Sequence, residues 1–377
     1  MSLGNIELGR HPAAVLRPLR FRSVVMDFPL LVTILAICAY GFIVLYSALE
    51  ENSALLIRQA VRFGIALGTF VVVAQIPPRL LRLWTPWVFG LGLCLLLVVE
   101  INGDIGKGAQ RWLDLGIIRF QPSEIIKLAV PMMVAWFMHE RTLPPKFSQL
   151  FVLLLIVFVP AVMIARQPDL GTAILVIAAG GITILLAGIS FRMILVSGLL
   201  AVGCAPLLWH FMRDYQRARV MTFLNPESDP LGAGYNIIQS KIALGSGGLF
   251  GKGWLNGTQA HLEFLPERST DFVFAVMGEE FGLLGLLLLL ALYLALIGRG
   301  LYIAMEAQDT FTRLLAGTVS LTFFFYVFVN AGMVSGLLPI VGVPLPFVSA
   351  GGTSMVTLMA GFGMLVAIQG NKKLLAP

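Results

Sequence analysis

The stretch FVFAVMGEEFGLLGLLLLLALYLALI, residues 272–297, decides the class of fold. It is longer than the roughly 20 apolar residues that a helix needs to cross about 30 Å of hydrocarbon. Only Glu279 and Glu280 bring charge into it. The polar sequence ERSTD, residues 267–271, comes directly before it. This part of the chain therefore predicts a membrane-spanning helix with an ionisable cluster at its start.

The composition of the whole chain agrees with a protein that lies in a bilayer. Hydrophobic residues make up 58% of the sequence and charged residues 12%, and the mean hydropathy is +0.89, far from the usage of a soluble domain. The repeated apolar runs predict an all-α polytopic membrane protein with about ten transmembrane helices and one long extracytoplasmic loop. The predicted spans are 28–48, 56–75, 84–101, 122–138, 147–165, 171–189, 191–211, 272–297, 312–333 and 345–368.

The distribution of basic residues predicts the orientation of these spans. Arginines precede the first span and basic residues recur in alternate connections, whereas the first intervening loop carries Glu50 and Glu51. The positive-inside rule then places both termini in the cytoplasm. The chain divides into a cytoplasmic segment 1–27, spans one to seven in 28–211, an extracytoplasmic loop 212–271, spans eight to ten in 272–368, and a cytoplasmic tail 369–377. The net charge of +6 fits loops facing anionic membrane lipids, so no nucleic-acid partner is predicted.

The cysteines and histidines predict no metal or redox site. Cys38, Cys94 and Cys204 all fall inside predicted spans and lack metal-binding or redox spacing, so we expect them to pack as small hydrophobic residues. The four histidines are scattered and show neither a zinc signature nor a histidine-based triad. Any chemistry is therefore expected at outer loops and helix ends.

The stretch GKGAQRWLDLGIIRFQPSEIIKLAVP, residues 106–131, is the first polar candidate. Arg111 and Trp112 place a cation beside an interfacial aromatic residue. Glu124 and Lys127 fall on one face of the following helix, with Lys127 roughly 7 Å below the start of the span. Two hypotheses stay open for Lys127: it forms a self-neutralising pair with Glu124, or it faces an internal cavity and holds an anionic group.

Two further stretches extend the candidate site. ARQPDLGTA, residues 165–173, contains Asp169, which fits either an ordinary helix N-cap or a binding role. In the segment 212–271, Arg217 and Arg219 lie just outside the seventh predicted span and fit attraction to lipid headgroups. The sequence YNIIQSKIALGSGGLFGKG, residues 235–253, predicts an amphipathic segment that ends in a glycine-rich turn, whose backbone amides could approach phosphates.

Asp271 ends the polar cluster before the eighth span. Ser269 or Thr270 is a plausible N-cap for this span, which would make Asp271 one of its first helical residues. The helix dipole favours an anion there. A catalytic or binding carboxylate is the alternative, since Glu267 and Arg268 are adjacent and apolar residues follow at once.

Six motifs together resemble the SEDS family of bacterial cell-wall glycosyltransferases, over about residues 28–370. They are RWLDLG, FQPSEIIKLAVP, QPDLGTA, GSGGLFGKGWLNGTQ, EFLPERSTDFVFAVMGEEFG and GMVSGLLPIVGVPLPFVSAGGTS. Within the family, the stretch GMVSGLLPIVGVPLPFVS resembles elongation proteins more than division proteins. Ser269 stands where the family commonly has His, and Ala350 where it has Tyr.

The resemblance implies a peptidoglycan glycosyltransferase that polymerises lipid II into glycan strands at the outer face of the bacterial inner membrane during cell elongation. It implies that Asp271 is the essential carboxylate, for which we expect the role of general base. It also implies a divalent cation, Mg²⁺ or Mn²⁺, and a class B penicillin-binding protein, a transpeptidase, as partner. The candidates for binding lipid II and the nascent glycan are Lys127, Glu124, Arg111, Trp112, Gln121, Asp169, Arg217, Arg219, Gln239, Ser240 and Glu267.

Two other classes of function remain open at this stage. A flippase for lipid-linked cell-wall precursors would explain charges inside the membrane, but its polar residues are expected near the midplane. A non-catalytic scaffold of a cell-wall synthesis complex would explain the long outer loop, but it would not need Lys127 or a base at a helix mouth.

Overall fold

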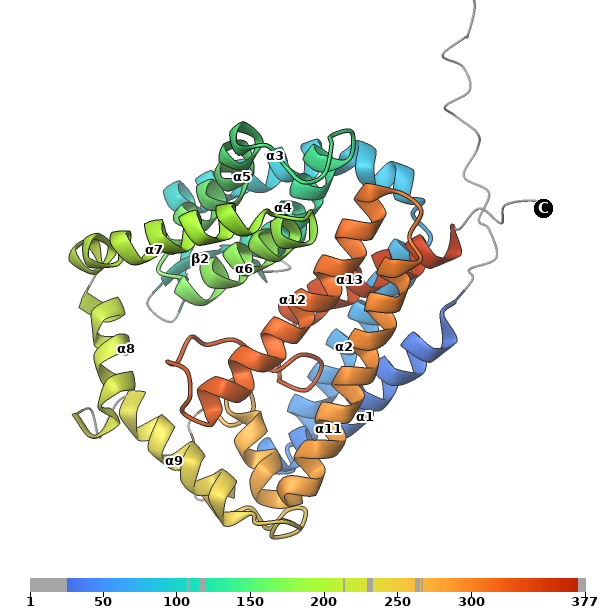
Figure 1. Ribbon diagram of the computed structural model, residues 1–377. Coiled ribbons are helices and arrows are strands. Elements are labelled where there is room, and N and C mark those ends of the chain that lie inside the picture. Colours follow the sequence, from blue (N-terminus) through green and yellow to red (C-terminus); the bar gives the residue numbers. More distant parts are fainter. Residues whose placement is uncertain are drawn as a thin grey trace, which may run out of the picture.

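The protein is a bundle of long helices, seen in a computed structural model that describes residues 26–106, 109–114, 119–212, 214–228, 233–261, 265 and 267–371 (Figure 1). Its α-helices are α1 Phe28–Ala48, α2 Ser53–Ala74, α3 Pro78–Asn102, α4 Pro122–Met138, α5 Phe147–Arg166, α6 Leu170–Leu186, α7 Phe191–Phe211, α8 Asp214–Leu224, α9 Ala233–Ser246, α10 Thr258–His261, α11 Val273–Met305, α12 Thr310–Val334 and α13 Thr353–Gly370. Residues 1–25 and 372–377 of the predicted terminal segments lie outside the described residues.

Every predicted span contains a helix, and the largest differences in its bounds are at the eighth and tenth spans. Helix α11 continues to Met305, beyond the predicted end at 297, and α13 begins at Thr353 rather than at 345. Pro344 and Pro346 explain the late start of α13, because proline disfavours helix both at its own position and at the residue before it. In the described part of the chain, seven helices are long and apolar enough to cross a membrane, namely α1, α2, α3, α5, α11, α12 and α13, and α6 is a shorter apolar helix.

A small antiparallel sheet between α3 and α4 departs from the all-α prediction. Its strands are β1 Asp104–Gly106, β2 Ala109–Asp114 and β3 Arg119–Phe120. Strand β2 pairs with β1 on one side and with β3 on the other. Pairing of this kind depends on contacts across turns, which the apolar runs of the sequence do not reveal. The sheet places Arg111 and Trp112 next to the start of α4.

The segment 212–271, predicted as a loop, is largely helical where it is described. It contains α8, a 3₁₀ turn at Pro226–Ser228, α9 and α10. In Figure 1, α8 and α9 run in succession from the end of α7 to the lower end of α11. Ile237, Ser240 and Ala243 are buried on α9, and their spacing of three residues defines one packed face, as expected for an amphipathic segment.

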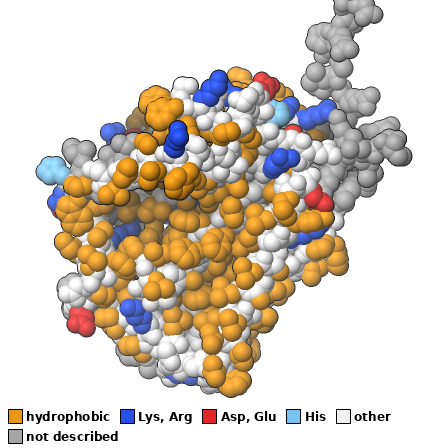
Figure 2. Space-filling view, viewed as in Figure 1, with side chains coloured by type: hydrophobic (Ala, Val, Ile, Leu, Met, Phe, Trp, Pro, Cys, Tyr) orange, Lys and Arg blue, Asp and Glu red, His pale blue; other side chains and the backbone are white. Residues whose placement is uncertain are grey.

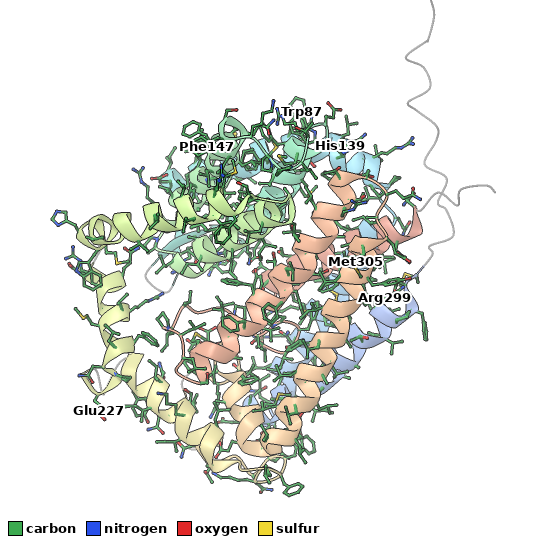
Figure 3. All side chains as sticks on the ribbon, in the orientation of Figure 1. Trp87, His139, Phe147, Glu227, Arg299 and Met305 are labelled. Carbon is green, nitrogen blue, oxygen red and sulfur yellow. The ribbon has the colours of Figure 1, made fainter. Side chains whose placement is uncertain are left out.

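Polar contacts at one end of the bundle join the start of α1 and three connections that the sequence predicts on the same side. Asp27 caps the start of α1, and its Oδ2 lies 2.6 Å from Arg299 Nη2 near the end of α11. Arg82 contacts His139, whose Nδ1 lies 3.9 Å from Asp309 Oδ1. Figure 3 shows His139 and Arg299 toward this end and Glu227 toward the other.

An ion pair between Glu50 and Arg268 marks the opposite end. Glu50 follows α1 directly, and α1 is 21 residues long, so it separates Asp27 from Glu50 by roughly 30 Å. The polar cluster before α11 therefore shares an end of the bundle with the acidic first loop. The two sets of connections thus lie at opposite ends of the bundle.

Apolar side chains cover much of the outside of the bundle. Figure 2 shows them spread over most of the visible face, and exposed examples include Trp87 on α3, Phe151 on α5 and Leu288 on α11. Inside, small residues allow close helix packing, since a Cβ added at Gly180 of α6 would lie 2.3 Å from Val157 Cγ2 of α5. This arrangement is typical of helices packed in a membrane.

Candidate functional site

The start of α4 carries a buried ion pair. Pro122 occupies the first turn of the helix, where it is well tolerated, and Gln121 is the N-cap residue. Lys127 Nζ lies 2.8 Å from Glu124 Oε1, and each of the two side chains is 8% exposed. The other oxygen of Glu124, Oε2, accepts a hydrogen bond of 2.7 Å from Thr357 Oγ1 on α13. The structure thus contains the Glu124–Lys127 pair that the sequence left as one of two hypotheses.

Asp169 is the centre of a second polar group beside this pair. Its Oδ1 accepts from the backbone N–H of Thr172 at 3.3 Å, so the predicted N-cap role is confirmed. Its Oδ2 accepts from Gln121 Nε2 at 2.8 Å, and Arg111 Nη1 lies 3.8 Å from Oδ1. Arg111 Nη2 also donates to the carbonyl of Pro168 at 2.6 Å. Strand β2, the α5–α6 turn and the start of α4 therefore meet at one cluster.

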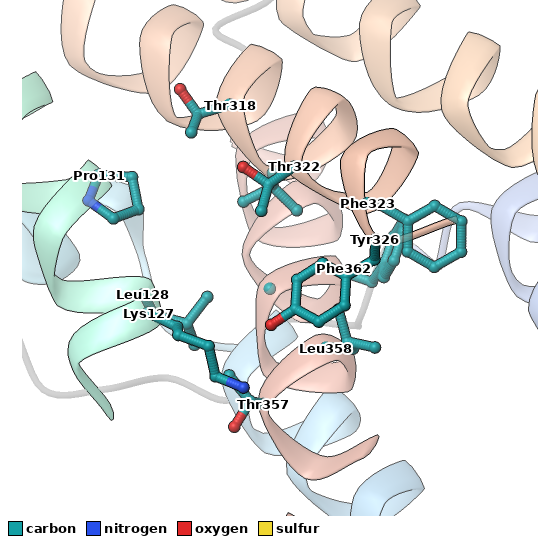
Figure 4. Close-up of a pocket in the computed structure, with 12 residues that line it drawn as sticks. Lys127, Leu128, Pro131, Thr318, Thr322, Phe323, Tyr326, Thr357, Leu358 and Phe362 are labelled. Atoms are coloured by element: carbon teal, nitrogen blue, oxygen red, sulfur yellow. The ribbon is translucent and has the colours of Figure 1, made fainter. Parts of the chain in front are cut away.

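Lys127 lines a pocket between α4, α12 and α13 (Figure 4). Its lining is mainly apolar and includes Thr318, Thr322, Tyr326 and Thr357. The Lys127 ammonium lies 5.6 Å from the centroid of the Tyr326 ring, within the range of a cation–π contact. Tyr326 could not be found from the sequence, because its pairing with Lys127 depends on the packing of α4 against α12.

The turn that carries Asp271 differs from its predicted local structure. Helix α11 begins at Val273, its N-cap residue is Phe272, and no side chain caps it. The predictions that Ser269 or Thr270 is the N-cap and that Asp271 is helical are therefore wrong. Residues 267–272 form turns instead, because their backbone is held by distant segments.

Contacts from α12 and the loop before α13 hold this turn. Asn330 Nδ2 on α12 donates to the backbone carbonyl of Asp271 at 2.9 Å and to that of Val343 at 2.7 Å. Ser349 Oγ donates to the carbonyl of Thr270 at 2.5 Å. The Asp271 backbone is fixed, while its side chain is half-buried beside Gly342, where an added Cβ would lie 3.4 Å from Asp271 Oδ2.

Helix α12 connects the Lys127 pocket to the Asp271 turn. Tyr326 faces Lys127, and Asn330 holds Asp271. Tyr326 and Asn330 are four residues apart, so they lie on the same face of α12 and about 6 Å apart along its axis. The two residues of α12 that contact the candidate groups are therefore about one helical turn apart on the same side of α12.

Two of the remaining predicted site residues make contacts that stabilise the fold. Arg217 donates to the carbonyls of Trp209 at 3.1 Å and His210 at 2.7 Å, at the end of α7. Ser240 donates to the carbonyl of Val334 at 2.8 Å, which joins α9 to the end of α12. Neither contact brings a polar group to the Lys127 or Asp271 clusters.

The other four predicted site residues lie on the Asp271 turn, on β2, on α8 and on α9. Glu267 Oε2 accepts from Thr270 Oγ1 at 2.7 Å, within the Asp271 turn. Trp112 is half-buried on β2, and Arg219 and Gln239 are half-buried on α8 and α9. Their part in binding stays a prediction.

The described residues form no metal site whose ligands are all protein side chains. They contain no group of three or more His, Cys, Asp or Glu side chains that could hold an ion. Mg²⁺ is commonly bound through one or two carboxylates together with substrate phosphates. A divalent cation would need the substrate as a further ligand here.

Comparison with known proteins identifies the class to which this fold and site belong. Residues 28–374 match the family that comprises FtsW, RodA and SpoVE, described as cell cycle proteins, and the chain belongs to this family. It is 53% identical to the peptidoglycan glycosyltransferase MrdB of Escherichia coli K12, over 93% of this chain and 95% of that protein. It is 35% identical to the probable peptidoglycan glycosyltransferase FtsW of Trichlorobacter lovleyi, over 94% and 96% of the two chains.

Solved structures give the same result for the fold. One solved chain comes from a study of how a peptidoglycan synthase complex coordinates polymerization and crosslinking. It superposes on this chain with a TM-score of 0.81 at 31% sequence identity, and the match covers 93% of this chain and 99% of that one. The rod shape determining protein RodA of Thermus thermophilus superposes with a TM-score of 0.71 at 27% identity and the same coverage. The resemblance read from the motifs is therefore confirmed.

Proposed function

We infer that this chain is a peptidoglycan glycosyltransferase that polymerises lipid II during cell elongation. The observation that carries the inference is the 53% identity to the E. coli peptidoglycan glycosyltransferase MrdB over nearly the full length of both chains. The site supports the same chemistry, because the half-buried Asp271 carboxylate, the buried Glu124–Lys127 pair and the more exposed Arg111–Asp169 pair lie toward one end of the bundle. A transferase that acts on a lipid-anchored sugar needs its reactive groups near the membrane surface, where the sugar leaves the bilayer.

Asp271 is the proposed general base. It takes the proton from the acceptor sugar hydroxyl as that oxygen attacks the anomeric carbon of the donor and the bond to the diphosphate breaks. The base must stay in place while two large substrates move past it. Hydrogen bonds from Asn330 to the Asp271 carbonyl and from Ser349 to the Thr270 carbonyl hold its backbone independently of either substrate.

Lys127 and Arg111 are the proposed partners of the leaving diphosphate. The ammonium of Lys127 has three donors, and the bond to Glu124 uses one of them. The pair therefore fixes the ammonium without consuming its capacity to bind phosphate oxygens. Arg111 is oriented in a similar way by Asp169 and by the carbonyl of Pro168. Preorganised donors of this kind stabilise charge that develops in a transition state.

The membrane topology and the cation are part of the same proposal. We propose ten membrane spans, with both termini in the cytoplasm and the segment 212–271 outside, supported by the grouping of connections at the two ends of the bundle. The protein then lies in the inner membrane, surrounded by membrane lipids. A divalent cation, Mg²⁺ or Mn²⁺, that enters with the diphosphate rests on the family resemblance.

A class B penicillin-binding protein is the proposed partner. The supporting observation is the likeness to a chain studied within a peptidoglycan synthase complex that coordinates polymerization and crosslinking. Crosslinking in native membranes followed by purification should recover a single-pass transpeptidase. Its repeated absence would count against this part of the proposal.

Purified protein in liposomes that contain lipid II tests the main assignment. A glycosyltransferase produces glycan polymer, a flippase moves lipid II between leaflets without polymer, and a scaffold does neither. We expect polymer, and addition of EDTA should reduce its formation if a divalent cation enters with the substrate. Translocation without polymer would overturn the assignment.

A further inference from the structure

Helix α11 is broken inside its apolar length. Gly282 has φ 63° and ψ −163°, a conformation that is open essentially to glycine alone. In an unbroken helix the N–H groups of residues 283 and 284 would donate to the carbonyls of residues 279 and 280. The break leaves four backbone groups without these partners. Such groups are strongly unfavourable in a membrane when nothing else satisfies them.

The segment Gly247–Gly253, which we call the glycine clasp, supplies all four missing partners. The N–H of Lys252 donates to the Glu279 carbonyl at 2.9 Å, and that of Gly253 to the Glu280 carbonyl at 3.0 Å. The N–H groups of residues 283 and 284 donate to the carbonyls of residues 248 and 249 at 3.0 and 3.2 Å. The clasp follows α9 and lies at the lower end of α11 in Figure 1.

The glycines of the clasp are needed for the close approach of two backbones. A Cβ added at Gly247 would lie 2.0 Å from the Gly278 carbonyl oxygen, and one at Gly251 would lie 2.1 Å from that of Glu280. The sequence suggested that amides of this turn approach phosphates. The structure instead engages the amides of Lys252 and Gly253 with α11.

A buried carboxylate fixes the clasp from the side. Glu279 is fully buried, and its Oε1 lies 2.6 Å from Lys252 Nζ. The same carboxylate accepts from Thr258 Oγ1 at 3.0 Å and from the backbone N–H of Gln259 at 3.1 Å. The Glu279 carboxylate therefore adds a side-chain link between the clasp, α10 and the half of α11 that precedes the break.

This half of α11 leads directly to the proposed base. It runs from Val273 to residue 281, spans about 13 Å, and starts two residues after Asp271. At its upper end the turn is held by Asn330 and Ser349. At its lower end it meets the break, where Glu280 also accepts a hydrogen bond from Ser47 of α1. The position of this half-helix relative to the rest of α11 depends on the contacts that stabilise the break at Gly282.

We propose that the glycine clasp positions Asp271 by completing the broken helix α11, with Lys252 as the positioning residue that acts through Glu279. This inference rests on the proposed role of Asp271 as general base. With the clasp in place, the short half-helix behaves as part of one rigid element. Without it, the half-helix pivots at Gly282 and the carboxylate loses its alignment with the acceptor hydroxyl.

The test compares Lys252→Met with Lys252→Arg and with Lys241→Met, which changes an exposed lysine on the neighbouring α9. Full-length proteins in detergent are examined by amide hydrogen exchange and by lipid II polymerisation at several substrate concentrations. Lys252→Met should speed exchange in peptides covering 248–253 and 282–285. It should also lower kcat by about 10- to 100-fold with KM unchanged, since misplacement of about 1 Å has effects of that size. Lys252→Arg and Lys241→Met should resemble the unmodified protein.

Two results would overturn the proposal: faster exchange with an unchanged kcat, or an unchanged exchange pattern in folded Lys252→Met whatever its activity. Lys252→Gln, which keeps a donor, replaces Lys252→Met if that variant does not fold, and the same outcomes apply. Asp271→Asn separates this inference from the proposed function. If that variant polymerises normally, the base assignment fails, and the exchange measurements still report on the clasp.

Discussion

Replacing Lys127 by Met tests how the buried pair on α4 works. The change leaves the Glu124 carboxylate, 8% exposed, with the hydroxyl of Thr357 but without the ammonium that lies 2.8 Å away. Removal of one member of a buried ion pair costs about 3–5 kcal/mol, because the other charge is left uncompensated. We expect a loss of that order in the free energy of unfolding, or the matching fall in Tm.

The double variant Lys127→Met/Glu124→Gln separates stability from catalysis. It removes both charges, and Gln can still accept the hydrogen bond from Thr357, so most of the lost stability should return. Polymerisation should not return, because a neutral pair cannot bind the leaving diphosphate. Loss of one preorganised donor to a developing charge typically lowers kcat by about 10²- to 10³-fold.

The assay measures thermal unfolding in detergent and lipid II polymerisation on the same preparations. Lys146→Met, which changes an exposed lysine before α5, is the control and should leave both quantities unchanged. A double variant that regains both stability and full polymerisation would refute the reasoning. Lys127 would then serve only to neutralise Glu124.

Three further outcomes follow from the packing and the grouping of loops. Asn330→Leu should lower the free energy of unfolding by about 1–3 kcal/mol, since it leaves buried carbonyls unpaired, and should also lower polymerisation. Unfolding and activity measurements check both effects, and unchanged activity would mean that Asn330 does not hold Asp271. Gly180→Leu should destabilise the α5–α6 contact, where even a Cβ would lie 2.3 Å from Val157 Cγ2, and an unchanged Tm would contradict that packing. With the native cysteines replaced, an impermeant maleimide applied to intact cells should label Glu227→Cys and spare Thr142→Cys, and the reverse pattern would invert the topology.

The spans could be predicted because the thickness of the bilayer dictates the length of each apolar run. Helices α1 and α4 begin and end where the sequence predicts. The cap by Asp169 was predictable for a similar reason, since it depends on a residue type at a local position. Local rules therefore account for the helices and for their ordinary ends.

The site depends on contacts between segments that are far apart in the chain. Lys127 meets Tyr326 and Thr357 only because α4 packs against α12 and α13. The polar residues before α11 suggested a cap by Ser269 or Thr270, but bonds from α12 and the following loop hold them in turns. The clustered glycines fit a phosphate loop as well as a backbone contact, and only the break at Gly282 distinguishes the two.

Polymerisation of lipid II by purified Asp271→Asn tests the central claim most directly. The substitution is nearly isosteric and leaves the backbone bonds to Asn330 and Ser349 available, so fold and lipid II binding should be retained. A general base typically contributes about 10²- to 10⁴-fold to the rate, and we expect polymer formation to fall by that amount. A well-folded Asp271→Asn protein that polymerises lipid II at the unmodified rate would contradict the account and place the base elsewhere.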